Sequence, residues 1–230
     1  MPKNFKTFEE AIEVSFNNLD LLRQAFTHRS YLNEHRGVTH GHNERLEFLG
    51  DAVLELIITH FLYEKFPASS EGDLTAYRAA LVNAVTLSEI AGSIGMNEYL
   101  LLSRGEAKDK GRARQMLLAN AFEALIGALY LDQGYEAVQK FLAGILFPKI
   151  DEIVQKGLWQ DAKSLLQERA QETERVTPNY KVLRETGPDH DKHFIVGVFV
   201  KEELIAEGSG KSKQEAEQTA ARAALAQKGW

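Results

Sequence analysis

The stretch Asn43–Ile57, NERLEFLGDAVLELI, places three acidic residues inside a segment with the apolar spacing of a buried helix. At about 100° per residue, Glu44, Glu47 and Asp51 fall within a sector of roughly 60°. Apolar residues fill the opposite side: Leu46, Leu49, Val53, Leu56 and Ile57. Removing a carboxylate from water costs several kcal/mol unless it is paired or bound to a metal ion. The stretch therefore predicts a long helix whose acidic face is either solvated surface or part of a site.

A second helical stretch, QMLLANAFEALIGALYLDQ (115–133), carries polar residues among small ones. Asn120 and Glu123 are three residues apart, so they share one face of a helix. Alanine and glycine surround them, and small residues let two backbones approach closely. Packed face to face, the two helices would gather one oxygen-rich pocket. Its members would be Glu47, Asp51, Asn120 and Glu123, with Glu44 and the Glu71 of the SSEGD turn at the rim.

Converging carboxylates repel one another unless a cation lies among them. Ligation by oxygen alone favours Mg²⁺, Mn²⁺ or Ca²⁺ over zinc. A di-iron carboxylate bundle would need a Glu-x-x-His pattern on two helices, which neither stretch has. The GSGKS at 208–212 does not complete a phosphate-binding loop, because the first glycine of that motif would fall at Ile205. The residues thus predict a site for a hard metal ion.

The composition is typical of a globular protein with one or two domains: 230 residues, 44% hydrophobic and 26% charged. No apolar run reaches the roughly 18 residues that a membrane span needs, and the first residues lack the apolar segment of a secretory signal. Because there is no cysteine, we expect no disulfide and a cytoplasmic location. The net charge of −6 lies before Lys156, since basic and acidic residues are equal in number, 12 of each, from there onward.

The spacing of the apolar residues changes near residue 155. From Phe8 to Val154 they recur every three or four residues, which predicts a helical bundle. After a linker at 156–160, the chain predicts a short helix capped by Asp161, three strands and an alanine-rich final helix. The strands are NYKVLRET (179–186), HFIVGVFV (193–200) and ELIAEGS (203–209). We therefore expect an all-α domain at 1–155 and a small α+β domain, in α-β-β-β-α order, at 161–230.

Four motifs of the first region closely resemble bacterial ribonuclease III, an endoribonuclease specific for double-stranded RNA. They are FTHRSY (26–31), HNERLEFLGD (42–51), SEGDLTAYRAALVN (70–83) and ANAFEALIGALYLD (119–132). The motifs GPDHDKHF (187–194) and GSGKSKQEAEQTAA (208–221) are similar to the double-stranded RNA-binding domain of that family. The resemblance covers nearly the whole chain. It implies a helical endonuclease domain followed by a duplex-RNA-binding domain.

The resemblance also implies roles for particular residues. Glu47, Asp51, Asn120 and Glu123 would hold a catalytic Mg²⁺, for which Mn²⁺ is a substitute, and the catalytic residues would be Asp51, Glu123, Glu44 and Glu71. Water activated by the metal would hydrolyse the phosphodiester bond. The family acts as a homodimer that leaves 5′-phosphates and short 3′ overhangs, in rRNA processing and RNA turnover. Phe48 matches a dimer contact; the alternative is an ordinary core aromatic.

Asn120 departs from the family pattern, in which we expect aspartate. Its amide oxygen can ligate a metal ion, but it brings no charge. Three explanations stay open: an engineered change that traps substrate, a natural variant that tolerates the loss, or a protein that has become a catalytically silent binder of duplex RNA. We favour the first, because every other position of the motif is intact.

For RNA contact, the resemblance selects five residues of the second domain: Gln167, Glu168, His190, Lys211 and Lys213. Such domains read the shape and 2′-hydroxyls of an A-form duplex over about 16 base pairs. Lys211 and Lys213 would meet phosphates at a helix start, which already favours anions; a merely solvated helix start is the alternative. The segment Ser103–Arg114, with five basic and two acidic residues, either steers phosphate toward the acidic pocket or is a solvated loop.

Overall fold

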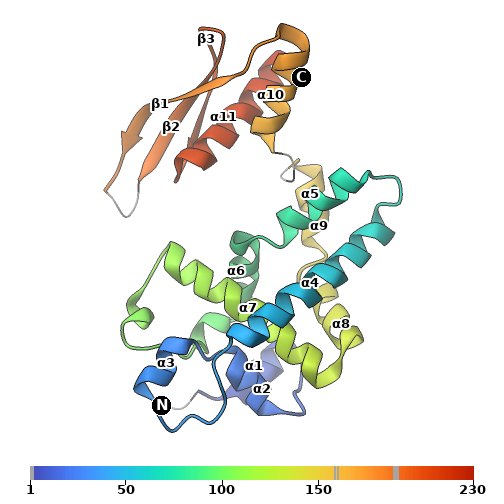
Figure 1. The fold of residues 1–230 in the computed structure, drawn as a ribbon, viewed down its shortest axis with the longest axis vertical. Coiled ribbons are helices and arrows are strands. Elements are labelled where there is room, and N and C mark those ends of the chain that lie inside the picture. Colours follow the sequence, from blue (N-terminus) through green and yellow to red (C-terminus); the bar gives the residue numbers. More distant parts are fainter. Residues whose placement is uncertain (1–2, 158, 160, 189–191) are drawn as a thin grey trace. The chain divides into compact units, whose positions relative to one another are not determined.

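The computed structural model describes residues 3–157, 159, 161–188 and 192–230. It divides into two compact units, Met1–Trp159 (the first unit) and Gln160–Trp230 (the second unit). The expected fold class is confirmed: the first unit is helical, and the second has the α-β-β-β-α order (Figure 1). The helices of the first unit are α1 Phe5–Ile12, α2 Leu19–Ala25, α3 Arg29–Glu34, α4 Glu44–Lys65, α5 Glu71–Leu81, α6 Ala84–Ser93, α7 Arg112–Gln133, α8 Tyr135–Ile145 and α9 Lys149–Gln155, with short 3-10 turns η1 Met96–Glu98 and η2 Glu106–Lys108.

The core of the first unit is built around α4 and α7, which cross each other (Figure 1). A Cβ atom on Gly50 would lie 1.7 Å from the carbonyl oxygen of Glu123, and one on Gly127 would lie 2.2 Å from the carbonyl oxygen of Leu46. Real Cβ contacts are never so short, so only glycine fits at either position. The two helices therefore touch backbone to backbone, directly beside the predicted ligands.

The outer face of α4 carries a stripe of exposed apolar side chains, Phe48, Leu56 and Tyr63, which we call the α4 stripe. Their exposed fractions are 82%, 59% and 71%. The expectation that Leu56 lies on the buried side of this helix was wrong, because Val53, Leu54 and Ile57 cover the core and leave Leu56 beside the outer face. Phe48 is not a core aromatic in the single chain.

The start of α4 is held by two extended segments. The backbone N–H of Leu101 donates to the carbonyl of Phe26, and that of His28 donates to the carbonyl of Leu101. Buried Asn43 precedes α4, and its side-chain amide donates to the carbonyl of Ala25 at 3.2 Å. The FTHRSY motif and residues 100–102 therefore form one wall beside the acidic end of α4.

Helix α5 begins at Glu71 because Ser70 and Asp73 form a capping box. The Ser70 hydroxyl accepts from the backbone of Asp73, and the Asp73 carboxylate accepts from the backbone of Ser70. Glu71 is thus the first residue of a helix and not part of a turn. Arg78 of α5 donates to Thr59 of α4, so α5 runs back along α4 from the C-terminal end of α4.

The second unit contains an antiparallel sheet with the strand order β1-β2-β3. Its elements are α10 Ala162–Glu174, β1 Asn179–Thr186, β2 His193–Val200, β3 Glu203–Gly210 and α11 Lys213–Lys228. Each predicted strand matches an observed strand to within one residue. The predicted alternation in β2 is confirmed by burial, with one face formed by Phe194, Val196, Val198 and Val200.

Helix α11 packs on β2 and β3 through its alanines, as the composition of this helix predicts. A Cβ atom on Gly208 of β3 would lie 2.1 Å from the backbone nitrogen of Ala220 and 2.4 Å from the carbonyl oxygen of Ala216. The helix and the strand are therefore in backbone contact, as α4 and α7 are in the first unit.

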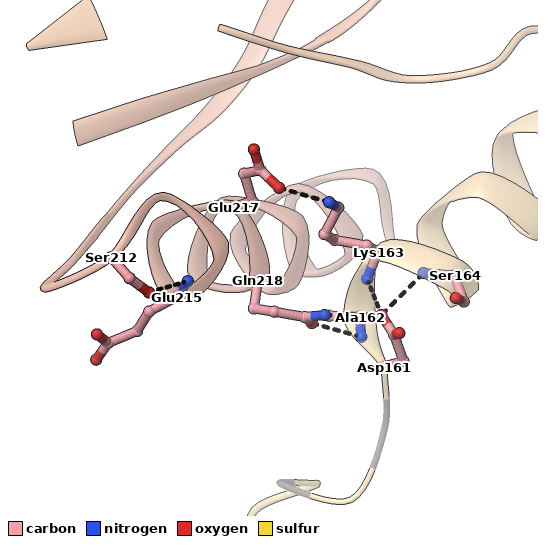
Figure 2. A network of polar contacts seen from close by, with 8 residues as sticks. All are labelled: Asp161, Ala162, Lys163, Ser164, Ser212, Glu215, Glu217 and Gln218. Carbon is pink, nitrogen blue, oxygen red and sulfur yellow. Dashed lines mark hydrogen bonds and ion pairs between the residues drawn. The ribbon is translucent and has the colours of Figure 1, made fainter. Parts of the chain in front are cut away.

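Figure 2 shows how α10 is fastened to α11. Asp161 caps α10 by accepting from the backbone of Lys163 and Ser164. The Gln218 side chain donates to the Asp161 carboxylate at 2.8 Å and accepts from the backbone of Ala162 at 3.0 Å. We call this pair of hydrogen bonds the Gln218 bracket. A salt bridge between Lys163 and Glu217 lies next to it.

In the part of the chain that the structure describes, no helix is both long enough and apolar enough to cross a membrane.

Candidate functional site

The predicted ligands lie where α4 crosses α7. Glu47 and Asp51 are one turn apart on α4, and Asn120 and Glu123 are nearly one turn apart on α7. Glu47 and Asn120 line a cavity of about 240 Å³. Its other walls are His28, Asn43, Glu44, Leu100, Leu102 and Leu117.

The carboxylates of this group lie close enough to repel one another. Burial raises the pKa of Glu123 to about 7, and the charges of Asp51 and Glu47 add to the rise. Burial also raises the pKa of Glu47, and the charges of Glu44 and Asp51 act in the same direction. Without a cation, Glu123 is therefore only partly ionised at neutral pH.

Asn120 lowers this repulsion. Its side-chain amide donates a hydrogen bond to the Glu47 carboxylate, which opposes the rise in the pKa of Glu47. An aspartate at position 120 would replace the donor by a further negative charge. To bind a cation, the Asn120 amide has to turn so that its oxygen faces the ion.

The donor set fits a hard cation, because it consists of carboxylate and amide oxygens without thiolate or imidazole. The raised pKa values point the same way, since a cation would relieve the repulsion that causes them. Among the residues that the structure describes, however, no three histidine or acidic side chains are grouped so that they could hold a metal ion as they stand. Asp51 is exposed, although its charge acts on Glu123. The ligand assignment stays a prediction.

The two acids expected at the rim lie in different places. Glu44, the first residue of α4, lines the cavity, and its carboxylate lies 3.5 Å from Arg29 Nη1 and 3.7 Å from His42 Nδ1. Glu71 begins α5, beyond the C-terminal end of α4. At 1.5 Å per residue, that end of α4 lies roughly 20 Å from Asp51 along the helix axis. Its carboxylate accepts a hydrogen bond from the Thr75 hydroxyl. Within one chain, the structure does not bring Glu71 to the acidic group.

Sequence reasoning assigned no role to the residues that close the cavity. His28 caps α3 by accepting from the backbone of Ser30, and the Ser30 hydroxyl accepts from the backbone of Ser103. This chain of contacts holds residues 100–103 against the start of α4. The motifs FTHRSY and HNE contain His28 and Asn43, so the signal was present in the sequence without a role attached to it.

The candidates for RNA contact in the second unit are exposed. Gln167 and Glu168 lie on the outer side of α10, and Lys211 and Lys213 lie at the start of α11. His190 falls outside the described residues.

The start of α11 is less open to anions than we expected. Ser212 caps the helix by accepting from the backbone of Glu215, as Figure 2 shows. The Glu215 carboxylate accepts from the backbone of Lys211 at 2.8 Å and thus already places a negative charge there. The Lys213 ammonium lies 5.8 Å from the centre of the Phe194 ring. Phosphate contact at this end therefore rests on the two lysines more than on the helix dipole.

Comparisons with known proteins agree with this arrangement. A family model described as Ribonuclease-III-like matches residues 18–150, and one described as Double-stranded RNA binding motif matches residues 162–228. Ribonuclease 3 of Bacillus licheniformis is 54% identical over 224 residues, which cover 97% of this chain and 90% of that protein. Ribonuclease 3 of Bdellovibrio bacteriovorus is 46% identical, and the matched residues cover 97% of this chain and 95% of that protein.

A solved structure supports the fold of the first unit. The nuclease domain of ribonuclease III from Campylobacter jejuni is 36% identical, with a TM-score of 0.57, and the match covers 64% of this chain and 97% of that domain. A second structure of that domain is described as showing structural flexibility in a region involved in dimer formation. Two family models match this chain, and relatives named Ribonuclease 3 cover nearly all of it. The chain therefore belongs to the ribonuclease III family.

Proposed function

We propose that this protein is an endoribonuclease that hydrolyses double-stranded RNA and leaves 5′-phosphates with short 3′ overhangs, in cytoplasmic rRNA processing and RNA turnover. The observation that carries the proposal is the acidic group at the α4–α7 crossing, in a chain that also carries a duplex-RNA-binding fold. A carboxylate cluster alone, or an RNA-binding domain alone, would be weaker support for this function.

In this proposal, Glu47, Asp51, Asn120 and Glu123 are the ligands of Mg²⁺, with Mn²⁺ as a substitute. The bound ion would lower the pKa of a water molecule and neutralise charge on the phosphoryl oxygens. Asp51 and Glu123 act most directly, and Glu44 orients groups at the rim through Arg29 and His42. Since Glu123 has a pKa of about 7, it has to lose its proton to bind the ion, so ion affinity should rise with pH around neutrality.

A catalytically silent binder of duplex RNA is the second candidate, and Asn120 is the observation that favours it. The site has one negative charge fewer than an all-carboxylate site, and its amide is hydrogen bonded to Glu47. Loss of a charged ligand weakens the binding of a dication more than it weakens RNA binding by the second unit.

The α4 stripe supports a homodimer. Three large apolar side chains on one helix face are costly to leave in water, and a second copy of the chain would cover them. Phe48→Glu should shift the chain to monomer in sedimentation experiments, while Val85→Glu, at another exposed apolar residue, should not. If the Phe48 variant and the unchanged chain dimerise with equal affinity, Phe48 is not part of the interface.

In the second unit, we propose contacts to the minor groove from Gln167 and Glu168 and to phosphates from Lys211 and Lys213. His190 remains a sequence-based prediction. The isolated residues 157–230 should bind duplex RNA more tightly than duplex DNA, because 2′-hydroxyl contacts discriminate between them. Equal affinity at moderate salt would contradict this assignment.

The decisive experiment compares cleavage of a long RNA duplex by three chains in Mg²⁺: the unchanged chain, Asn120→Asp and Glu123→Ala. We expect cleavage by Asn120→Asp, much weaker cleavage by the unchanged chain and none by Glu123→Ala, with RNA affinity in all three within a few-fold. Binding without cleavage by both the unchanged chain and Asn120→Asp would favour the silent binder. Normal cleavage by Glu123→Ala would show that α7 does not contribute to the active site.

A further inference from the structure

A second cavity, of about 340 Å³, adjoins the candidate active site. Both cavities are lined by Leu100 and Leu102, so the same short segment forms a wall of each. None of the carboxylates at the α4–α7 crossing lines the second cavity. Its remaining walls are Lys3, Tyr31, Leu101, Ala107 and Arg114.

The charged side chains that line this cavity are both cations. The Lys3 ammonium donates to the carbonyl oxygens of Glu98 and Leu100, at 2.5 and 2.8 Å. Burial lowers the pKa of Lys3, the charge of Glu98 opposes the change, and the nearby charge of Arg114 lowers it further. The two cations are therefore near enough to repel one another, and an anion between them would be stabilised.

Arg114 lacks a partner for part of its guanidinium group. Nε donates to the side-chain oxygen of Asn97 at 2.8 Å, but the buried Nη1 has no hydrogen-bond partner. In the described parts of the chain, neither Arg114 nor Lys3 forms an ion pair. A buried donor without an acceptor is unfavourable, and more so when it is charged. Arg114 also lines the cavity, so an acceptor held there would lie beside this guanidinium group.

The backbone adds to the positive potential. Arg114 is the third residue of α7, a helix of 22 residues, and no side chain caps this helix at Gly111. The free N–H groups of an uncapped helix start attract anions. The segment Ser103–Arg114, with five basic and two acidic residues, leads into this helix start.

We propose that the cavity between Lys3, Tyr31 and Arg114 binds a phosphate group, and that this phosphate belongs to an RNA strand lying in the adjoining active site. The inference rests on the proposed function for its choice of RNA but not for the anion site itself. Phosphate suits the cavity because a guanidinium binds its oxygens bidentately and an ammonium adds a point charge. A phosphate contact here would fix the strand beside the acidic group, where the like charge of the carboxylates otherwise repels it.

The first arm of the test uses inorganic phosphate and the full chain. At a phosphate concentration about tenfold above the dissociation constant, the melting temperature of the first unit should rise by about 3 °C over chloride at matched ionic strength. Arg114→Gln keeps a donor for Asn97, and phosphate should raise the melting temperature of this variant by less than about 1 °C. Arg112→Gln, which removes an equal charge two residues away but outside the cavity, should behave as the unchanged chain. An equal rise in melting temperature in all three chains would mean that phosphate binds as an adventitious ion only, and would overturn the proposed site.

The second arm measures binding of duplex RNA against salt, without divalent cations. Loss of one phosphate contact should reduce the slope of log affinity against log salt by about 0.9 in Arg114→Gln relative to Arg112→Gln. If phosphate stabilisation depends on Arg114 while the two slopes are equal, the ligand is a free phosphate and the RNA assignment is overturned. If the chain binds no duplex RNA while Arg114 still governs phosphate binding, the proposed function fails and the anion site stands.

Discussion

The two units both bring two backbones together at glycine, yet they place opposite kinds of side chain beside the contact. At the α4–α7 crossing, Gly50 and Gly127 allow the approach, and charged Asp51 and Glu123 lie next to it. At the β3–α11 contact, the atoms nearest to a Cβ on Gly208 belong to Ala216 and Ala220. Close packing therefore concentrates charge in the first unit and buries only apolar surface in the second.

The same kind of backbone contact therefore has opposite energetic consequences in the two units. In the first unit, approach of the helices forces carboxylates together and raises their pKa values, so stability should depend on pH and on cations. In the second unit, approach only excludes water from alanine and valine. Substitutions at the two contacts should thus affect different observables.

The largest effect is expected for Gly50→Ala. A methyl group 1.7 Å from the carbonyl oxygen of Glu123 has no flexible neighbour to displace, so the helices have to separate. We expect a loss of about 3 kcal/mol or more in the stability of the first unit. Because a shift of about 1 Å in a catalytic group can cost 100-fold in rate, cleavage should fall at least that far. Calorimetry and a cleavage assay would measure the two effects.

Gly92→Ala is the matched control for Gly50→Ala. Gly92 lies within α6, and a Cβ atom there would meet nothing within 4 Å. Alanine is a better helix former than glycine by about 1 kcal/mol, so this variant should be slightly more stable and cut normally. Equal behaviour of the two alanine variants would break the claim that the α4–α7 crossing needs backbone contact.

Gly208→Ala should destabilise only the second unit. Its methyl group would lie 2.1 Å from the backbone of Ala220, and overpacking of this kind costs about 1–3 kcal/mol. We expect weaker binding of duplex RNA and a lower melting transition for the second unit. The transition of the first unit, followed in the same calorimetric scan, should not move; a shift of both transitions would mean that the units do not unfold independently.

The pH dependence of stability should come from the first unit. Between the ordinary pKa of 4.5 and about 7, folded Glu123 holds a proton that the unfolded chain has lost. The free energy of unfolding should therefore fall as pH rises through this window and level off above it. Melting of the metal-free chain from pH 5 to 8 would record the decline.

Glu123→Gln should remove most of that decline, because glutamine does not titrate. Glu55→Gln, on the exposed side of α4, should keep it. Addition of Mg²⁺ at pH 8 should raise the melting temperature of the unchanged chain and leave Glu123→Gln nearly unaffected. The same pH profile in all three chains would contradict the repulsion between the carboxylates.

The smallest effect is expected at the Gln218 bracket. Gln218→Ala removes one hydrogen bond to Asp161 and one from the backbone of Ala162, and should cost about 1 kcal/mol in the second unit. Gln214→Ala, on the exposed side of the first turn of α11, is the control and should be nearly neutral. Thermal melting of residues 157–230 would detect the difference, and no difference would mean that water replaces the bracket.

The sequence predicted the second unit better than the first. Strand boundaries followed from the alternation in HFIVGVFV and from Gly and Pro at the turns, which act locally. In α4, apolar residues lie on more than one face, so their spacing could not separate Leu56 from the core set. The exposure of Leu56 depends on what packs against the helix, which a single helical period does not contain.

For the site, the residue types could be read from the sequence but their contacts could not. The ten-residue acidic motif and the alanines around Asn120 predicted two helices that meet. That Gly50 touches Glu123, that the Asn120 amide is bonded to Glu47, and that Glu71 lies at the far end of α4 all depend on where the helices cross. The capping box at Ser70 was visible in SEGD and would have moved Glu71 onto α5.

The Gln218 bracket has a mechanical consequence. The chain enters the second unit at Asp161, so any tension in the linker arrives at the first residue of α10. There the bracket passes part of the load to the second turn of α11, where the salt bridge between Lys163 and Glu217 also joins the two helices. A pull on the tether is thus borne by side-chain contacts between two helices as well as by the backbone of α10.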